Sequence, residues 1–328
     1  MDKIKKIYTL KTGITTEMAL LVVGMVDKGN TKAGEPYVSV ELFDGIKKIN
    51  VNFFRETVDT LRAKGVMENT VLIISLTLGT NGFYNQNDWH INTDSSVTEK
   101  DFIHAAPIDT EKSFKWLLEE VSAVNTNPDG IGPYKSISHL TLKLLRNNEN
   151  EFKRSSAAVS MHHNFLSGLL YHTIRMVCMA KKACDVYKDL DRELLVCAVA
   201  LHDIGKISCY ETLDVGEANM TVEGRLLDHS LTGIMMIHDA SREDIYNPEK
   251  ILMLEHMLAS HHGKKKWDAI TTPAFPEAEM LHLIDMIDSR MNMFEEAYKG
   301  QQAGTISEGK VYGLENSYIY KAMYQDEL

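Results

Sequence analysis

The sequence predicts two domains of different fold class, a small β-barrel at the N-terminus and an all-helical bundle after it. Two observations predict this arrangement. Short apolar or alternating segments separated by turns recur through the first hundred residues. From about residue 134 the apolar residues instead recur with the period of an α-helix. The 328-residue chain is 44 % hydrophobic and 25 % charged, so it is long enough to bury a core in each domain.

Residues 1–95 contain the segments that are expected to form the barrel. The segment 37–43 alternates apolar and polar residues, and a hairpin turn around Gly45 leads into the next strand. A short helix is expected at 55–64. The expected strands are 19–26, 37–43, 49–54, 70–80 and 88–92. Five strands with a helix between the third and the fourth is the plan of an OB-type barrel.

The rest of the chain is expected to be helical. Residues 96–135 are predicted to form a linker with one short helix at 111–124, and residues 136–328 to form the helical domain with its C-terminal tail. The expected helices of that domain are 136–147, 149–158, 165–187, 191–203, 223–239, 248–262 and 276–299.

One apolar segment imitates a targeting sequence. Residues 18–26 follow several lysines, as in a secretory signal, but no small-residue cleavage site comes after them. Nine apolar residues are also too few to span a bilayer. We therefore expect a buried strand and no membrane segment.

The charge of the chain is uneven. The formal net charge is −11; residues 1–100 hold 12 basic and 12 acidic side chains, whereas residues 101–328 hold 23 basic and 34 acidic ones. A strongly acidic domain is a poor electrostatic partner for nucleic acid and a good one for divalent cations. The four cysteines have no C-x-x-C spacing, so we expect reduced thiols in a cytosolic protein.

Histidine and aspartate side chains gather at apolar positions of the predicted helices. His202 and Asp203 end one helix in LHDIGK, and the others come from further helices. Imidazole and carboxylate groups on facing helices are how bundles hold metal ions, and a carboxylate such as Asp203 can bridge two of them. The candidate ligands are His172, His202, Asp203, His229, His261, His262 and Asp285.

A single histidine at a helix end is ordinarily explained by the helix macrodipole. Burying the whole set without a partner would be costly, so the joint pattern favours a metal site. Mixed nitrogen and oxygen ligands suit Mn, Fe, Ni, Co, Zn or Mg rather than a metal that prefers thiolates.

Three other side chains are candidate substrate contacts. Lys206 follows the His-Asp pair and could hold a phosphate oxygen; the alternative is a solvated lysine at a helix end. Arg225 is expected one turn before His229 on the same helix and could also contact phosphate. His163 precedes the helix of His172 and is a further candidate contact.

These segments resemble a known family. H…HD…D is the signature of the HD-domain metal-dependent phosphohydrolase superfamily. The wider set includes MHHNFLSGLLYHTIRM, LHDIGK, TVEGRLLDH, SHHGKKKW and GLENSYIYK. It resembles the bacterial YhaM-type 3′→5′ exoribonucleases, which join an N-terminal OB fold to an HD domain. The resemblance covers nearly the whole chain and is strongest over 150–325.

The resemblance implies hydrolysis of single-stranded RNA, and of single-stranded DNA as well, from the 3′ end to nucleoside 5′-monophosphates. It implies two bound divalent cations, Mn²⁺ first among them, and a cytoplasmic homo-oligomer. By position, the family's core ligands match His172, His202, Asp203 and Asp285. The additional ligands of two-metal members match His229 and the pair His261 and His262, and the spacing leaves open which of that pair binds.

The barrel has little surplus basic charge, so aromatic side chains are its expected contacts with nucleic acid. Tyr37 and Phe43 are expected on the polar face of one strand and Phe54 on the next, where they could stack on unpaired bases. The alternative is that these rings pack beneath the linker. Tyr84 and Trp89 are further candidates.

Two other functions fit parts of the pattern. The first is a phosphohydrolase for small nucleotides, which the acidic helical domain and the neutral barrel favour. The second is a non-enzymatic OB-fold adaptor whose helical domain senses a nucleotide or a metal. The intact ligand set argues against the adaptor, because a sensor need not keep every ligand.

Overall fold

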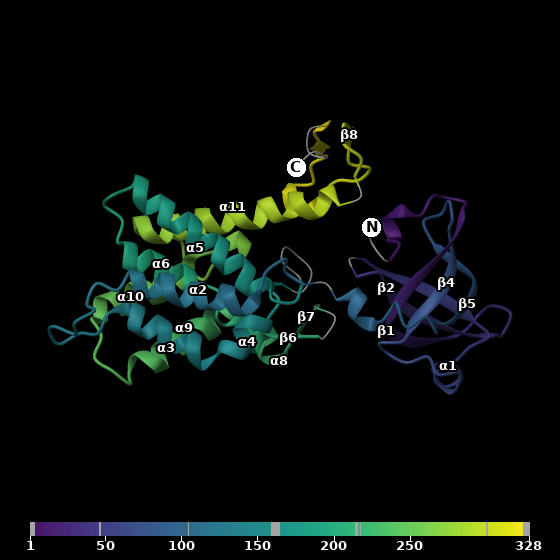
Figure 1. Ribbon diagram of the computed structural model, residues 1–328, viewed down its shortest axis with the longest axis horizontal. Helices are drawn as coiled ribbons and strands as arrows, with labels where there is room; N and C mark the ends of the chain where they lie inside the picture. The colour runs from purple at the N-terminus through teal and green to yellow at the C-terminus, as the bar shows by residue number, and fades with distance from the viewer. Residues whose placement is uncertain are drawn as a thin grey trace. The chain divides into compact units, whose positions relative to one another are not determined.

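The computed structural model describes residues 4–45, 47–103, 105–158, 165–213, 216, 218–299 and 301–323. The chain divides into two compact units, Met1–His104 and Ala105–Leu328 (Figure 1). The division falls inside the segment 96–135, which the sequence predicts to be a linker. The helix of that segment belongs to the second unit, because Phe114, Leu117 and Val121 are buried in the helical core.

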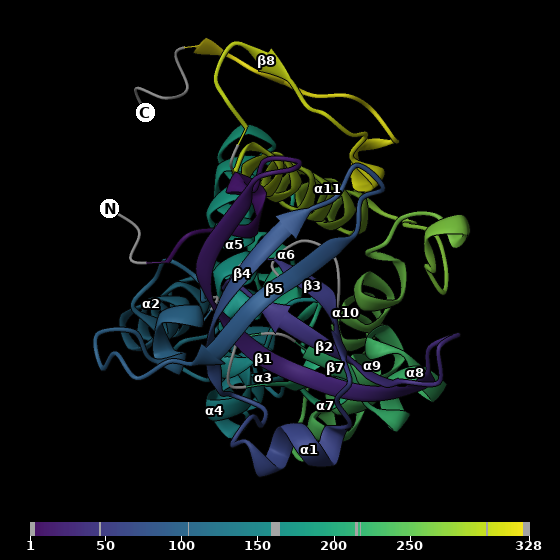
Figure 2. The ribbon, with the colours of Figure 1, turned by 90° about the vertical axis from the view of Figure 1, so that its right-hand side faces the viewer.

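The first unit is a five-stranded antiparallel sheet (Figure 2). Its strand order is β3-β2-β1-β4-β5, which leaves β3 and β5 at the two ends, and the helix α1, Val58–Ala63, lies between β3 and β4 in the chain. The fold is therefore OB-like. The strands are β1 Thr15–Asn30, β2 Pro36–Phe43, β3 Lys48–Phe54, β4 Val71–Leu78 and β5 Tyr84–Ile91.

Alternating apolar residues build the core of this sheet. Val38, Val40 and Leu42 of β2 are fully buried, and Val40 pairs with Val51 of β3. β1 is longer than its apolar segment because its polar end, up to Asn30, still pairs with β2 after it has left the core. Apolar periodicity therefore locates β1 but underestimates its length.

The second unit is a bundle of helices around one buried helix. All residues of α6 from Glu193 to Leu201 are buried, and α2, α3, α5, α10 and α11 pack around it. The principal helices are α2 Thr110–Ala123, α3 Ile137–Asn147, α4 Glu149–Arg154, α5 Gly168–Val186, α6 Arg192–Leu201, α9 His229–Ser241, α10 Pro248–Ser260 and α11 Pro276–Tyr298.

Shorter elements connect these helices. Two of them are helical, α7 Lys206–Cys209 and α8 Val222–Leu227. Two-stranded hairpins are formed by β6 Tyr210–Thr212 with β7 Ala218–Met220, and by β8 Thr305–Ile306 with β9 Tyr320–Lys321.

The prediction of a single helix at 223–239 is wrong. The chain breaks at Asp228, which has a φ of 64°, so α8 ends before it and α9 begins after it. The Asp228 carboxylate then caps α9 by accepting a hydrogen bond from the Ser230 backbone nitrogen. The apolar period runs on through this reversal, so the sequence pattern does not reveal it.

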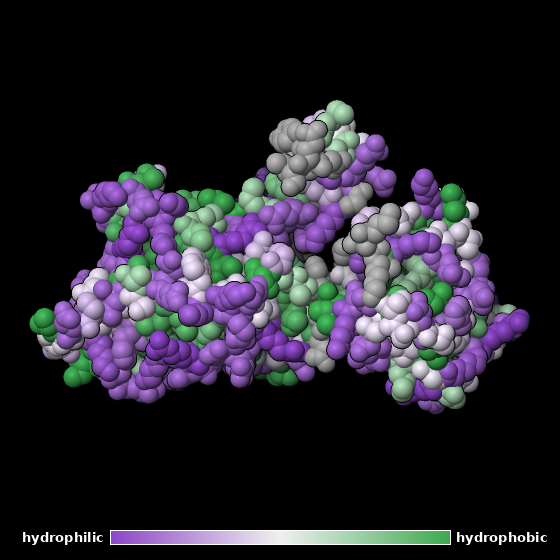
Figure 3. All heavy atoms as spheres, in the orientation of Figure 1, coloured by the Kyte–Doolittle hydropathy of each residue, from purple (hydrophilic) through white to green (hydrophobic). Residues whose placement is uncertain are grey.

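The visible surface mixes hydrophilic and hydrophobic side chains. Figure 3 shows hydrophilic side chains over most of the visible face, with smaller hydrophobic patches between them. Among the helices of the described residues, none combines the length and apolar character that crossing a membrane requires.

Candidate metal centre

The His-Asp pair lies at the end of the buried helix α6. His202 and Asp203 follow Leu201 in a tight turn, and both side chains are almost fully buried. Gly205 permits this turn to approach the start of α9, because a Cβ there would lie 2.6 Å from the backbone nitrogen of Gly233. The sequence LHDIGK thus places two polar side chains at the middle of the bundle.

The remaining candidate ligands reach the same place from four other helices. His172 lies within α5 and Asp285 within α11. His229 is the first residue of α9, and the pair His261 and His262 directly follows α10. These side chains form two groups, and the ligand atoms within each group lie within 4.8 Å of one another. One group is His172, His202 and Asp285, and the other is His229, His261 and His262.

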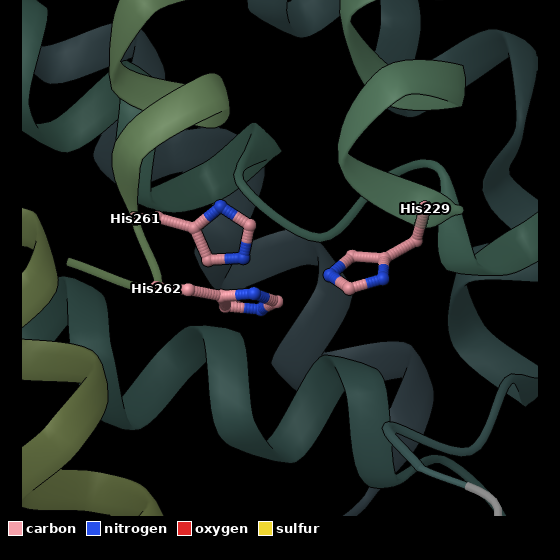
Figure 4. Close-up of side chains that lie close together, drawn as sticks. All are labelled: His229, His261 and His262. Carbon is pink, nitrogen blue, oxygen red and sulfur yellow. The ribbon is translucent and has the colours of Figure 1, made fainter. Parts of the chain in front are cut away.

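The Asp203 carboxylate lies between the two groups and directs one oxygen to each. Oδ2 is 3.2 Å from His202 Nε2 and 3.8 Å from His172 Nε2. Oδ1 is 3.4 Å from His229 Nε2 and 3.8 Å from His261 Nε2. Figure 4 shows the second group, with the three rings directed toward a common point. This is the arrangement that a carboxylate bridging two cations requires.

Backbone carbonyl groups set the orientation of two rings. His202 Nδ1 donates a hydrogen bond to the Val199 carbonyl at 2.8 Å, and His261 Nδ1 donates to the Leu258 carbonyl at 2.6 Å. Because a carbonyl can only accept, each ring carries its proton on Nδ1, and the Nε2 lone pair faces the centre.

Carboxylates orient two further rings. His172 Nδ1 lies 2.7 Å from Asp288 Oδ2, and the other oxygen of Asp288 contacts Arg175 Nε at 2.6 Å. His229 Nδ1 lies 3.2 Å from Asp228 Oδ1. Sequence reasoning missed the contacts of Arg175 and Asp228. Arg175 could have been found, because it lies one helical turn after His172 in YHTIRM.

The buried atoms at this centre fit a cation. Several have no hydrogen-bond partner within the described part of the chain, and an unpartnered buried polar atom is costly. They are Nε2 of His202, His229 and His261, Nδ1 of His262 and Oδ1 of Asp203. All of them are electron-pair donors of the nitrogen and oxygen type, which suits a first-row divalent metal or Mg²⁺.

The charge state of the groups supports the same conclusion. Burial lowers the pKa of His261 far below its usual value and also lowers the pKa of His262, so both rings are neutral. Burial would raise the pKa of Asp203, but His202 and Lys206 hold it well below its ordinary value. Neutral imidazoles and an ionised carboxylate are the forms that bind metal.

His172 behaves differently without a metal. Burial would lower its pKa, but hydrogen bonds to Asp285 and Asp288 raise that pKa to about 9. Asp285, 3.4 Å from His172 Nε2, has its own pKa lowered by this contact in spite of burial. A positive charge is therefore favoured at this position, and a cation between the two side chains would supply it.

Comparison with known proteins agrees with this geometry. Residues 169–291 match the HD domain family. The chain is 30 % identical to the 3′-5′ exoribonuclease YhaM of Bacillus subtilis (strain 168) over 306 residues, which cover 93 % of this chain and 94 % of that protein. The chain belongs to the YhaM-type 3′-5′ exoribonuclease family. The same identity holds to the 3′-5′ exoribonuclease YhaM of Bacillus pumilus (strain SAFR-032), over 98 % of this chain and 99 % of that protein.

The three candidate substrate contacts differ in whether the structure places them at the metal centre. Lys206 is buried and its Nζ contacts Asp203 Oδ2 at 2.6 Å, so it is not a solvated lysine. The expectation for Arg225 was wrong in its geometry: it is exposed on α8, and the break at Asp228 separates it from the helix of His229. His163 lies outside the described residues.

The aromatic residues expected on the open face of the sheet differ in how far their rings are exposed. The expectation that Phe43 lies on an open face was wrong, because Phe43 is 2 % exposed and pairs with the fully buried Leu21. Phe54 is 54 % exposed, and the ring of the half-buried Tyr37 lies beside it with centroids 5.7 Å apart. Trp89 packs on the buried Phe53, with centroids 5.5 Å apart.

Phe54 borders a hollow in this unit, and amide side chains form most of the wall of that hollow. Its volume is ≈ 310 Å³. Phe83, which the sequence reading missed, is 69 % exposed at the same place. The residues that line the hollow are Asn50, Asn52, Phe54, Asn81, Phe83, Tyr84, Asn85 and Gln86.

Proposed function

We propose that this chain is a metal-dependent 3′→5′ exoribonuclease that hydrolyses single-stranded RNA, and also single-stranded DNA, to nucleoside 5′-monophosphates. One observation carries the proposal: the Asp203 carboxylate lies between two histidine-containing groups and directs one oxygen to each. Family membership supports the polarity of the reaction and the RNA substrate, because both relatives are 3′-5′ exoribonucleases by name.

Two divalent cations, Mn²⁺ in our proposal, would occupy this centre. His172, His202 and Asp285 would hold one, and His229, His261 and His262 the other, with Asp203 shared. When bound, such cations supply Lewis acidity and a metal-bound water of lowered pKa, which is the nucleophile that phosphodiester hydrolysis needs.

The residues around the centre hold charge in place. The Asp203 carboxylate stays ionised, because its pKa is held low. Burial would lower the pKa of Lys206, but Asp203 raises it, so the ammonium group remains a fixed positive charge. That ammonium can stabilise the negative charge that develops on the phosphate oxygens.

The sheet would bind the single strand by stacking and by amide hydrogen bonds. Phe54 and Phe83 expose their rings beside a hollow lined with asparagine side chains. Residues 1–100 carry no net charge, so the contribution of phosphate contacts to binding is small. Stacking on aromatic rings tolerates any base, as an exonuclease requires.

The test is a digest with Mn²⁺ of the same RNA labelled at the 5′ or the 3′ end, run beside a panel of small nucleotides. We expect the 5′-labelled RNA to shorten stepwise while the 3′-labelled RNA releases a labelled mononucleotide at once. Asp203→Asn should abolish hydrolysis and keep the fold, whereas Asp239→Asn, at an exposed site on α9, should behave as wild type. Turnover of the small nucleotides alone would instead support the nucleotide phosphohydrolase.

A further inference from the structure

A cavity opens beside the candidate metal centre and continues along α11. Its volume is ≈ 530 Å³, which falls in the usual range for a small-ligand site. Asp203, Lys206 and Asp285 line its inner end. Its outer end is lined by Arg290 and by Tyr312, which belongs to the C-terminal segment. The segment that carries Tyr312 is a short 3₁₀ helix, Tyr312–Leu314, packed against α11.

Two aromatic side chains line this cavity and keep part of their rings open. Trp267 is 39 % exposed, and its ring lies 6.0 Å from that of His282, with 33° between the planes. Tyr312 is 78 % exposed. Large rings at the wall of a cavity, next to groups that hold charge, are the features of a site that binds a flat polar ligand.

Positive charge gathers at the same place in a unit that is acidic as a whole. Lys264 and Lys266 lie over the ring of Trp267, with their Nζ atoms 4.6 Å and 5.1 Å from its centroid. Lys206 lies at the inner end of the cavity and Arg290 at the outer end. The ligand of this cavity is therefore expected to be an anion that carries an aromatic ring.

Arg290 is already paired, but with an exchangeable partner. Its Nη1 lies 3.3 Å from Glu315 Oε1, and the Glu315 side chain is 81 % exposed. Glu315 and the next residue, Asn316, both have positive φ, 59° and 56°. Two consecutive left-handed residues that are not glycine are a costly conformation, and such strain concentrates at ligand clamps. A phosphate can replace the carboxylate on Arg290, because phosphate also pairs with a guanidinium group and the contact it displaces is a weak, exposed ion pair.

We propose that this cavity binds the unpaired 3′-terminal nucleotide of the substrate, with the base on the exposed ring of Tyr312 and a phosphate on Arg290 in place of Glu315. The inference rests on the proposed exonuclease function and adds the residues that select the substrate. The cavity, at ≈ 530 Å³, has the size of a small-ligand site and admits a single nucleotide but not a base pair, so a base-paired 3′ end is excluded. Because stacking does not read the base edge, all four bases should be accepted.

The test removes the ring from the enzyme or the base from the substrate. Tyr312→Ala should raise the KM for single-stranded RNA about tenfold and change kcat less than twofold. Tyr312→Phe should restore the wild-type KM, because it restores the ring. The matched control is Tyr318→Ala, which removes a tyrosine that is 58 % exposed in the same segment but does not line the cavity.

RNA whose last nucleotide lacks its base separates a binding role from a structural one. For the wild type, kcat/KM should be about tenfold lower on this RNA than on intact RNA. On this RNA the kcat/KM of Tyr312→Ala should equal that of the wild type, because the base that the ring would contact is absent from the substrate. Equal losses by Tyr312→Ala on both RNAs, or no loss on either, would overturn the inference. A wild-type chain that hydrolyses neither RNA would refute the exonuclease function itself, so the two failures are distinguishable.

Arg290 and Glu315 give an independent measurement. Arg290→Gln should raise the KM for RNA, whereas Glu315→Gln should lower it, because it frees the guanidinium group for phosphate. A rise in KM with both substitutions would mean that the pair only holds the C-terminal segment, and would overturn the exchange of partners.

Discussion

Replacing Gly205 by alanine tests whether the close approach of two chain segments positions the metal centre. Gly205 has a φ of −63°, which alanine adopts without strain, so the substitution acts through space alone. Its Cβ would lie 2.6 Å from the Gly233 nitrogen and closer still to the carbonyl oxygen of His229, whereas ordinary contact begins at 3.4 Å. The start of α9 must therefore move away by roughly 0.8 Å or more.

His229 moves with that turn. Its Nε2 lies 3.4 Å from Asp203 Oδ1, so a displacement of this size is a large fraction of the distance between these two ligand atoms. A misplacement of about 1 Å costs on the order of 100-fold in rate. Overpacking costs about 1–3 kcal/mol of folding free energy, which lowers Tm by roughly 2–12 °C in a unit of this size.

The assay for Gly205→Ala is Mn²⁺-dependent release of mononucleotides from single-stranded RNA, together with a thermal unfolding curve. Gly309→Ala is the matched control, because a Cβ at Gly309 meets no atom within 4 Å and its φ is not positive. Wild-type turnover by a folded Gly205→Ala protein would refute the view that this spacing sets the position of His229.

Three further predictions follow from the same structure. Asp288→Asn weakens the carboxylate contact to His172, so the affinity for Mn²⁺ should fall about 10- to 100-fold in a calorimetric titration; an unchanged affinity would contradict this role. Replacing Phe54 and Phe83 by alanine should weaken RNA binding by about 1–3 kcal/mol for each lost stacked base, measured by fluorescence anisotropy, with Val26→Ala, 57 % exposed on β1, as control. Chelation of Mn²⁺ initially present at 100 times its Kd should remove about 2.7 kcal/mol of stability and lower Tm by about 5–10 °C; a chelator without effect on Tm would show that the folded chain holds no metal.

The ligand set could be predicted because of where its residues lie along the helices. His172, His202 and Asp285 occupy positions that face a core, and a core rejects unpartnered polar groups. The contacts that hold these ligands in position were harder to predict. Arg175 lies one helical turn after His172, but both side chains contact Asp288 of another helix, and sequence spacing does not reveal a contact between residues so far apart in the chain.

The errors have physical causes that are equally specific. Strict alternation placed Phe43 on the polar face of its strand, but Leu20, Leu21 and Val22 of the neighbouring strand are all fully buried, so both faces of the sheet are covered there. Arg225 was misplaced because apolar periodicity is insensitive to the left-handed residue at Asp228. Phe83 lies in a turn, where no periodicity indicates whether a ring is exposed.

The order of the ligands along the chain has a consequence for the synthesis of the protein. The ligands run from His172 to Asp285, and Tyr312, at the outer wall of the cavity, is translated after all of them. While α11 is still inside the ribosome, the emerging chain lacks the Asp285 carboxylate that lies beside His172, so the candidate metal centre is incomplete. The proposed nuclease therefore cannot become active before α11 has left the ribosome and Asp285 has reached His172.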